Sequence, residues 1–143
     1  MTFSFGQSEH ERIEVDVLDY ERSPVGEFSN DNWLRVQIRV AVGGFRGKTD
    51  AAFITVELFA FLSELRMLYE NLSGKAEFAT LEEQLNLLLT GDGKGPIELV
   101  GEVADIAGIG NQLKFKFQID QSQLRASIAE LQRVVTEFPI RLP

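Results

Sequence analysis

The stretch NWLRVQIRVAVGGFRGKTDAAFITVELFAFLSELRMLYENLSG, residues Asn32–Gly74, decides the fold of the 143-residue chain. Apolar and polar side chains alternate through residues 33–42, the pattern of a β-strand that buries one face. Gly43-Gly44 is a turn signal, and residues 45–54 are expected to return as the partner strand. The first half of this stretch therefore predicts a β-hairpin.

An amphipathic helix is expected directly after the hairpin. Thr55 is the expected N-cap, and apolar side chains then recur every three to four positions over residues 56–72. A similar stripe returns near the C-terminus over residues 121–138. It follows Asp120, which has Gln123 three positions on, the spacing of a capping box. The chain is thus expected to hold two helices, each with one apolar stripe.

The remaining periodic segments predict strands joined by short turns. Counting the hairpin above, the expected strands cover residues 12–18, 33–42, 45–54, 75–80, 85–90, 97–105 and 113–119. Hairpins followed by helices favour an α+β fold with a mostly antiparallel sheet of about seven strands. Both helices are expected on one face of that sheet, which leaves the other face for solvent or for a partner.

Length and composition indicate a single domain, residues 1–143, of ordinary globular character. Residues 1–10 show no clear period and are expected to be loosely ordered. The chain has no cysteine, no secretory signal pattern and no apolar run long enough to span a membrane. A cytoplasmic protein is therefore expected.

The net charge of −8 is concentrated near the N-terminus. Residues 9–31 hold eight acidic residues and two arginines, a net charge of −6, which leaves −2 for the rest of the chain. An acidic surface repels nucleic acid and attracts basic partners. This segment is interpreted either as a solvated edge that aids solubility or as a surface for a partner protein.

Several familiar motifs are absent or incomplete. The segment GGFRGKT, residues 43–49, resembles a phosphate-binding loop but is one residue short, and it lies in a hairpin rather than before a helix. His10 is the only histidine, so neither a Ser–His–Asp set nor a histidine metal cluster can be assembled. Basic residues are scattered along the sequence, which argues against a nucleic-acid site. No cofactor or metal site is predicted.

Two features remain as candidates for function. Glu14 and Asp16 share one face of a strand, where paired carboxylates can bind a cation or act in acid–base chemistry. A deep pocket that contained Glu14, Asp16 or Asp105 would favour an enzyme. The same residues also fit a solvated strand face. Trp33 begins a strand out of phase with the apolar residues. Tryptophan is enriched at binding hot spots. The alternative is that this side chain packs beneath the N-terminal segment or the Phe28 loop.

Parts of the sequence resemble the WapI-type immunity proteins of bacteria. The resemblance extends over about residues 32–139. The motifs that carry it are Gly43-Gly44-Phe45, LSGKAEF (residues 72–78), GDGKG (residues 91–95) and FQIDQ (residues 117–121). Because these motifs are mainly turns and helix caps, they indicate the fold more strongly than they indicate a target.

The resemblance implies a non-enzymatic, cytoplasmic inhibitor that binds the toxic domain of a partner protein. It supplies no motif for the contact residues, so these are predicted from the charge pattern and from Trp33. The predicted partner-binding residues are Glu11, Glu14, Asp16, Asp19, Glu21, Asp31 and Trp33. No nucleic-acid or membrane partner is expected. The alternatives are a small-ligand or scaffold domain, which could form a homodimer, and an enzyme that works through carboxylates.

Overall fold

A computed structural model describes all 143 residues of the chain. The α+β class, the antiparallel hairpins and the two long helices are confirmed. The elements are β1 (Thr2–Ser8), β2 (Glu11–Tyr20), α1 (Phe28–Asp31), β3 (Trp33–Val42), β4 (Phe45–Ile54), α2 (Thr55–Asn71), β5 (Ser73–Ala79), β6 (Leu85–Asp92), β7 (Ile97–Ala104), β8 (Gln112–Ile119) and α3 (Gln121–Glu137).

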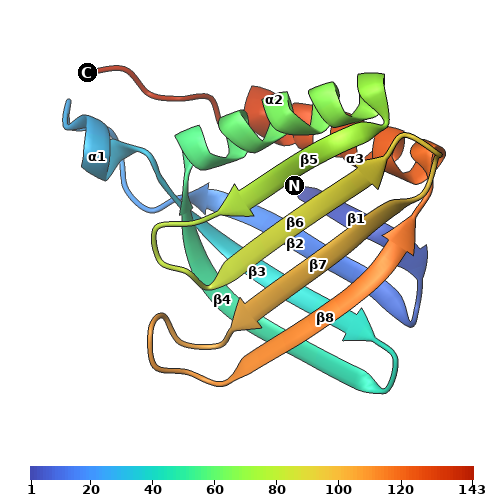
Figure 1. Cartoon of the computed structure of the whole chain (residues 1–143). Coiled ribbons are helices and arrows are strands. Elements are labelled where there is room, and N and C mark those ends of the chain that lie inside the picture. The colour runs from blue at the N-terminus through green and yellow to red at the C-terminus, as the bar shows by residue number, and fades with distance from the viewer.

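The strands number eight and form two sheets, whereas about seven strands in one sheet were predicted. Strands β1–β4 form the N-terminal sheet and β5–β8 form the C-terminal sheet, each in sequence order. Figure 1 shows the C-terminal sheet in front of the N-terminal sheet, with their strands crossing. The apolar faces of both sheets contribute to one core of 30 buried residues. An alternating pattern shows that one face of a strand is buried, but it does not show whether a helix or another sheet covers it.

The expectation that residues 1–10 are loosely ordered is wrong for most of this segment. Residues Thr2–Ser8 form β1, which pairs with β2 in antiparallel register. Phe3 and Phe5 are 0% and 1% exposed, so they belong to the core. The strand is too short to show a clear period in the sequence. Its order comes from pairing with β2 and from the burial of the two phenylalanine rings.

The two long helices lie together along one side of the two sheets (Figure 1). Helix α2 packs against β5 and α3 packs against β1, and the helices also contact each other. Each helix thus covers an edge strand, which protects the unpaired backbone groups of that strand. None of the helices combines the length and the apolar character needed to span a membrane.

The two helix starts differ in how well the sequence predicted them. Asp120 caps α3 as expected, because its carboxylate accepts a hydrogen bond of 2.7 Å from the Gln123 amide. The N-cap of α2 is Ile54 rather than Thr55. Thr55 is buried and its hydroxyl donates to the side chain of Asn32 at 2.7 Å. The Thr55 hydroxyl therefore bonds to Asn32, which is distant in the sequence, instead of capping the helix.

Candidate partner-binding site

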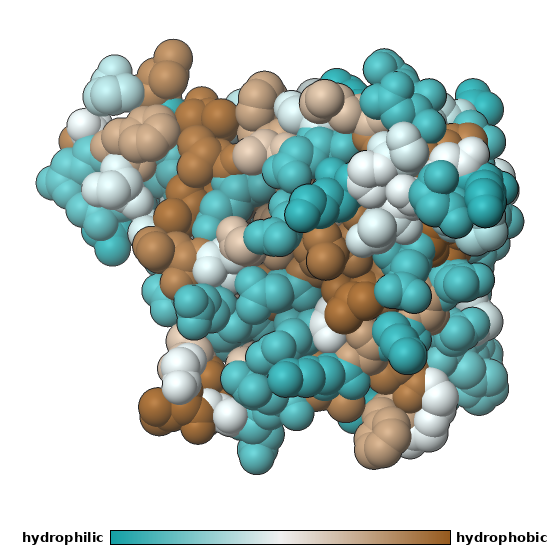
Figure 2. All heavy atoms as spheres, in the orientation of Figure 1, coloured by the Kyte–Doolittle hydropathy of each residue, from teal (hydrophilic) through white to brown (hydrophobic).

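The outer face of the C-terminal sheet has a balanced set of charges. Its charged side chains are Lys75, Glu77, Asp92, Glu98, Glu102, Lys114 and Lys116, and the register places Glu102 opposite Lys114. Figure 2 shows this side of the molecule as a mixture of hydrophilic and hydrophobic atoms. Neither sign of charge prevails on this face, so it does not select a charged partner.

The outer face of the N-terminal sheet gathers cations at one end. The strand register places Glu14 beside Arg39 and Arg39 beside Lys48. The neighbouring row runs from Arg12 through Ala41 to Arg46. Basic residues that are scattered along the sequence therefore become neighbours on this face of the folded sheet.

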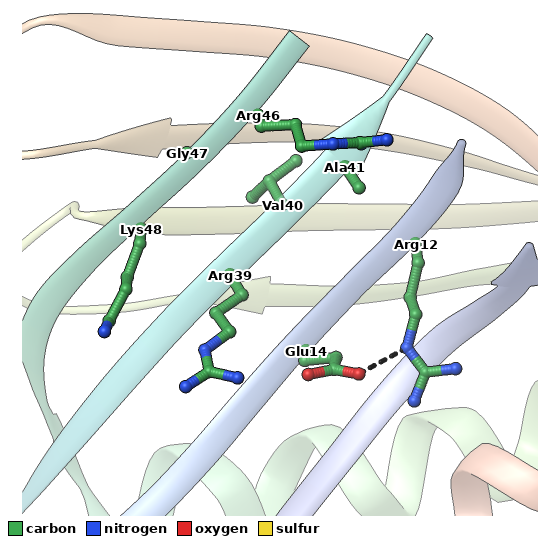
Figure 3. Close-up of a pocket in the computed structure, with 8 residues that line it drawn as sticks. All are labelled: Arg12, Glu14, Arg39, Val40, Ala41, Arg46, Gly47 and Lys48. Atoms are coloured by element: carbon green, nitrogen blue, oxygen red, sulfur yellow. Dashed lines mark hydrogen bonds and ion pairs between the residues drawn. The ribbon is translucent and has the colours of Figure 1, made fainter. Parts of the chain in front are cut away.

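These side chains line a shallow hollow of about 470 Å³ (Figure 3). We call it the cationic hollow, and its charged residues are Arg12, Glu14, Arg39, Arg46 and Lys48. The small side chain of Ala41 lies between Arg12 and Arg46 in its row and leaves the space open. Arg46 extends across this space, and its guanidinium donates to the Glu9 carbonyl at 3.1 Å. The hollow therefore presents several side-chain donors to solvent.

Three of the four cations in the hollow have no carboxylate partner. Arg12 pairs with Glu14 at 2.5 Å, and the other ion pair of the protein joins the N-terminal amine to Asp16 at 3.1 Å. Arg39, Arg46 and Lys48 are in neither pair. On a chain of net charge −8, the hollow is thus a local positive region that favours anionic groups.

The structure separates the acidic residues that were predicted to bind a partner. Glu14 lies in the cationic hollow, and Asp16 accepts hydrogen bonds from the N-terminal amine and from Thr2. Glu11 is exposed at the start of β2. Asp19 and Glu21 are exposed at the other end of this strand. The predicted acidic surface is therefore not one continuous patch.

Asp31 is the member of the predicted set that the structure removes from the surface. It is 2% exposed, and its carboxylate accepts hydrogen bonds from the amides of Val25, Gly26 and Glu27 at 2.8–3.1 Å. The Val25 amide is the main cause of a lowered Asp31 pKa; the other two amides and Arg141 add to it, while burial opposes it. Asp31 holds the loop before α1 in shape, so its carboxylate is engaged within the chain.

Asp19, Glu21 and Trp33 come together, and we call these three residues the acidic end. The Glu21 amide donates to the Trp33 carbonyl at 2.9 Å, and Asp19 lies opposite Arg35 on β3. Trp33 is half-buried and lies opposite Ile54 on the outer face. The neighbouring residue Tyr20 packs edge-on against Phe138, and its ring lies under the Arg141 guanidinium. Burial raises the pKa of the Tyr20 hydroxyl. The acidic end and the cationic hollow thus occupy opposite ends of one sheet face.

Among the carboxylates considered for an enzyme, Glu14 and Asp105 line two separate cavities, and Asp16 lines neither of them. Asp105 lies in the loop between β7 and β8, where it accepts two hydrogen bonds from Asn111 that lower its pKa. It lines a different cavity from that of Glu14. The segment of residues 43–49 forms a turn and the start of β4, which confirms that it lies in a hairpin rather than before a helix.

Comparison with known proteins identifies one family and a shared fold. The model of the family described as "Immunity protein WapI-like family" matches residues 4–139. This match begins well before residue 32, so the acidic segment near the N-terminus lies inside the matching region. No curated protein matches the sequence.

Two solved structures share the fold at low sequence identity. The plant transcriptional regulator PBF-2 is 13% identical with a TM-score of 0.51, over 96% of this chain and 81% of that chain. WHY1 from Arabidopsis thaliana is 15% identical with a TM-score of 0.51, over 98% of this chain and 85% of that chain. At these identities the similarity concerns the arrangement of sheets and helices alone.

Proposed function

The chain belongs to the immunity protein WapI-like family, and from this membership we propose that it binds and neutralises a partner toxin domain without catalysing a reaction. The observation that carries the proposal is the family match over residues 4–139. We further propose that it acts in the bacterial cytoplasm as one half of a 1:1 complex.

The outer face of the N-terminal sheet supports this proposal. Helix α3 contacts this sheet at its edge strand β1, and α2 packs mainly against β5 of the other sheet. The outer face of β3, where Arg35 and Arg39 are exposed, is therefore open to a partner. It has unpaired cations at one end and exposed acids at the other. A partner with the opposite arrangement of charges would be attracted and oriented before contact.

The test uses the full-length chain and the protein domain encoded by the neighbouring reading frame in the same genome. When the two are produced together, we expect a complex of 1:1 mass and growth of cells that the domain alone would kill. If the two proteins elute separately and the cells die as before, the proposed function is wrong. A homodimer mass without the second protein would support the scaffold alternative.

The acidic end offers a sharper test of how the partner is captured. We expect the double variant Asp19→Lys and Glu21→Lys to associate with the toxin domain about tenfold more slowly at low salt, because charge steering mainly changes association rates. Both side chains are exposed, so the fold should be unaffected. Stopped-flow measurements at low and high salt would show the difference shrinking as salt screens the charges.

A matched control makes the same charge change elsewhere. Glu77→Lys with Glu98→Lys reverses two exposed acids on the C-terminal sheet. Equal association rates for the two double variants would show that only net charge matters. The acidic end would then have no special role, although toxin binding itself could stand.

A further inference from the structure

Strand β4 has a free edge next to the cationic hollow. The outer edges of β1 and β5 are covered by helices: the Ser4 amide of β1 donates to Glu130 of α3 at 2.9 Å, and the Glu77 amide of β5 donates to Glu64 of α2 at 3.2 Å. On β4, the Asp50 carbonyl accepts from Gln84 at 3.1 Å. The first half of β4 has no comparable cover.

The hairpin geometry identifies the free backbone groups. The turn between β3 and β4 contains two residues, and Gly43 takes the φ of 59° that such a turn favours at its first position. The pair that flanks a two-residue turn is hydrogen-bonded, and hydrogen-bonded pairs then alternate along the ladder. The peptide groups of Arg46 and Lys48 therefore point away from β3. No hydrogen bond from another segment reaches them.

A groove of about 290 Å³ lies beside this free edge, and we call it the β4 groove. Its apolar lining consists of Ile38, Val40, Phe45, Val103 and Leu113. Gly47 lies opposite Val40 and has no side chain to fill the groove. The space beside it is open, because no atom lies within 4 Å of the position that a Cβ on this residue would occupy. Phe45 at the groove is 66% exposed, so its ring is available to a partner that pairs with this edge.

The edge, the groove and the charges together define a ligand. A strand that pairs with an edge points alternate side chains to opposite faces of the sheet. On β4 one face presents the cations Arg46 and Lys48, and the other face opens into the apolar groove. We propose that the first half of β4 binds an extended segment of the toxin domain in which acidic and apolar side chains alternate. This inference rests on the proposed function and names the surface that carries it out.

The same surface fits a protein segment better than a nucleic acid. Glu14 lies inside the cationic hollow, and Asp16 and Asp50 lie on the same sheet face, where they would repel a chain of phosphates. The net charge of −8 adds to this repulsion at long range. A free strand edge, in contrast, offers alternating donors and acceptors that match another peptide backbone.

The test fills the groove without removing any side chain. Gly47→Leu places an apolar side chain in open space on a strand residue of ordinary conformation, so the fold should be at least as stable as in the wild type. We expect it to weaken binding of the toxin domain about 100-fold in calorimetry. Gly44→Leu is the matched control, because Gly44 also has open space around it and lies outside the groove.

Charge reversal and hydrogen exchange test the other two parts of the ligand. Arg46→Glu with Lys48→Glu should weaken binding about tenfold or more. Lys75→Glu with Lys94→Glu should change it little, because both lysines are exposed and lie outside the cationic hollow and the β4 groove. In the wild-type complex the amides of Arg46 and Lys48 should exchange more slowly than in the free protein, because they become hydrogen-bonded.

The outcomes separate this inference from the proposed function. If the wild type does not bind the toxin domain, both fail. If it binds and Gly47→Leu binds as tightly as Gly44→Leu, the inference alone is overturned. A second outcome also overturns it. In that outcome a fluorescein-labelled single-stranded oligothymidylate binds the wild type but not the double variant Arg46→Glu with Lys48→Glu, while this variant still binds the toxin domain as tightly as the wild type.

Discussion

Replacement of Asn32 by alanine is expected to lower the free energy of unfolding by about 3–4 kcal/mol. Asn32 is fully buried, and its side chain joins three separate segments. Its carbonyl oxygen accepts from the Thr55 hydroxyl at 2.7 Å and from the Arg141 amide at 2.8 Å. Its amide group donates to the carbonyls of Phe28 at 2.8 Å and Arg141 at 3.0 Å. Truncation would leave these four groups without their partner.

Guanidinium unfolding of the full chain would measure this loss, and two further variants divide it. Asn32→Asp keeps the acceptor but loses the donor, so an intermediate loss is expected. Thr55→Val removes only the hydroxyl, and a loss of about 1 kcal/mol is expected. A midpoint for Asn32→Ala within error of the wild type would mean that water replaces the side chain and that the three segments do not depend on it.

Replacement of Gly6 by alanine is expected to cost about 3 kcal/mol or more. Gly6 lies where the pairing of β1 with β2 shifts register, and its φ is 83°. A Cβ at this position would lie 2.0 Å from the backbone oxygen of Glu11. The neighbouring strand would have to move, and the positive φ would add strain. Because the chain has 143 residues, the melting temperature should fall by roughly 6 °C or more.

Gly26→Ala is the matched control for this effect. Gly26 has a similar φ of 86°, but no atom lies within 4 Å of the position of its Cβ. Its replacement should show the cost of the backbone conformation alone, about 1 kcal/mol. Equal melting temperatures for the two variants would show that the contact with Glu11 is relieved at little cost.

The parts of the fold that depend on near neighbours in the sequence were predicted well. The strand periods, the Gly43-Gly44 turn and the capping box of Asp120 and Gln123 all involve residues within a few positions of each other. The expected helices over residues 56–72 and 121–138 differ by one residue at most from α2 and from the end of α3. Local periodicity reports these features because backbone geometry itself has the same period.

The features that the sequence did not reveal depend on how the strands pair and on how loops and the C-terminal segment pack in the folded chain. The acidic run near the N-terminus looked like one surface, but pairing places Glu14 among cations and folding buries Asp31. The tie from Asn32 to Arg141 spans most of the chain, so no local pattern could indicate it. A buried asparagine of this kind can be suspected only from its place between a loop and a strand.

The sequence by itself determined the two long helices, the hairpins of the predicted strands and, for most of these strands, the alternation that assigns an inner and an outer face. The tertiary structure decided that two sheets cover each other and that the residues of the cationic hollow meet. Arg12 and Arg46 become neighbours because β2, β3 and β4 pair at one register, and a shift of one residue would turn each set of side chains to the opposite face. That register is selected by burial of the apolar faces of both sheets, which is a property of the whole chain and not of any one segment.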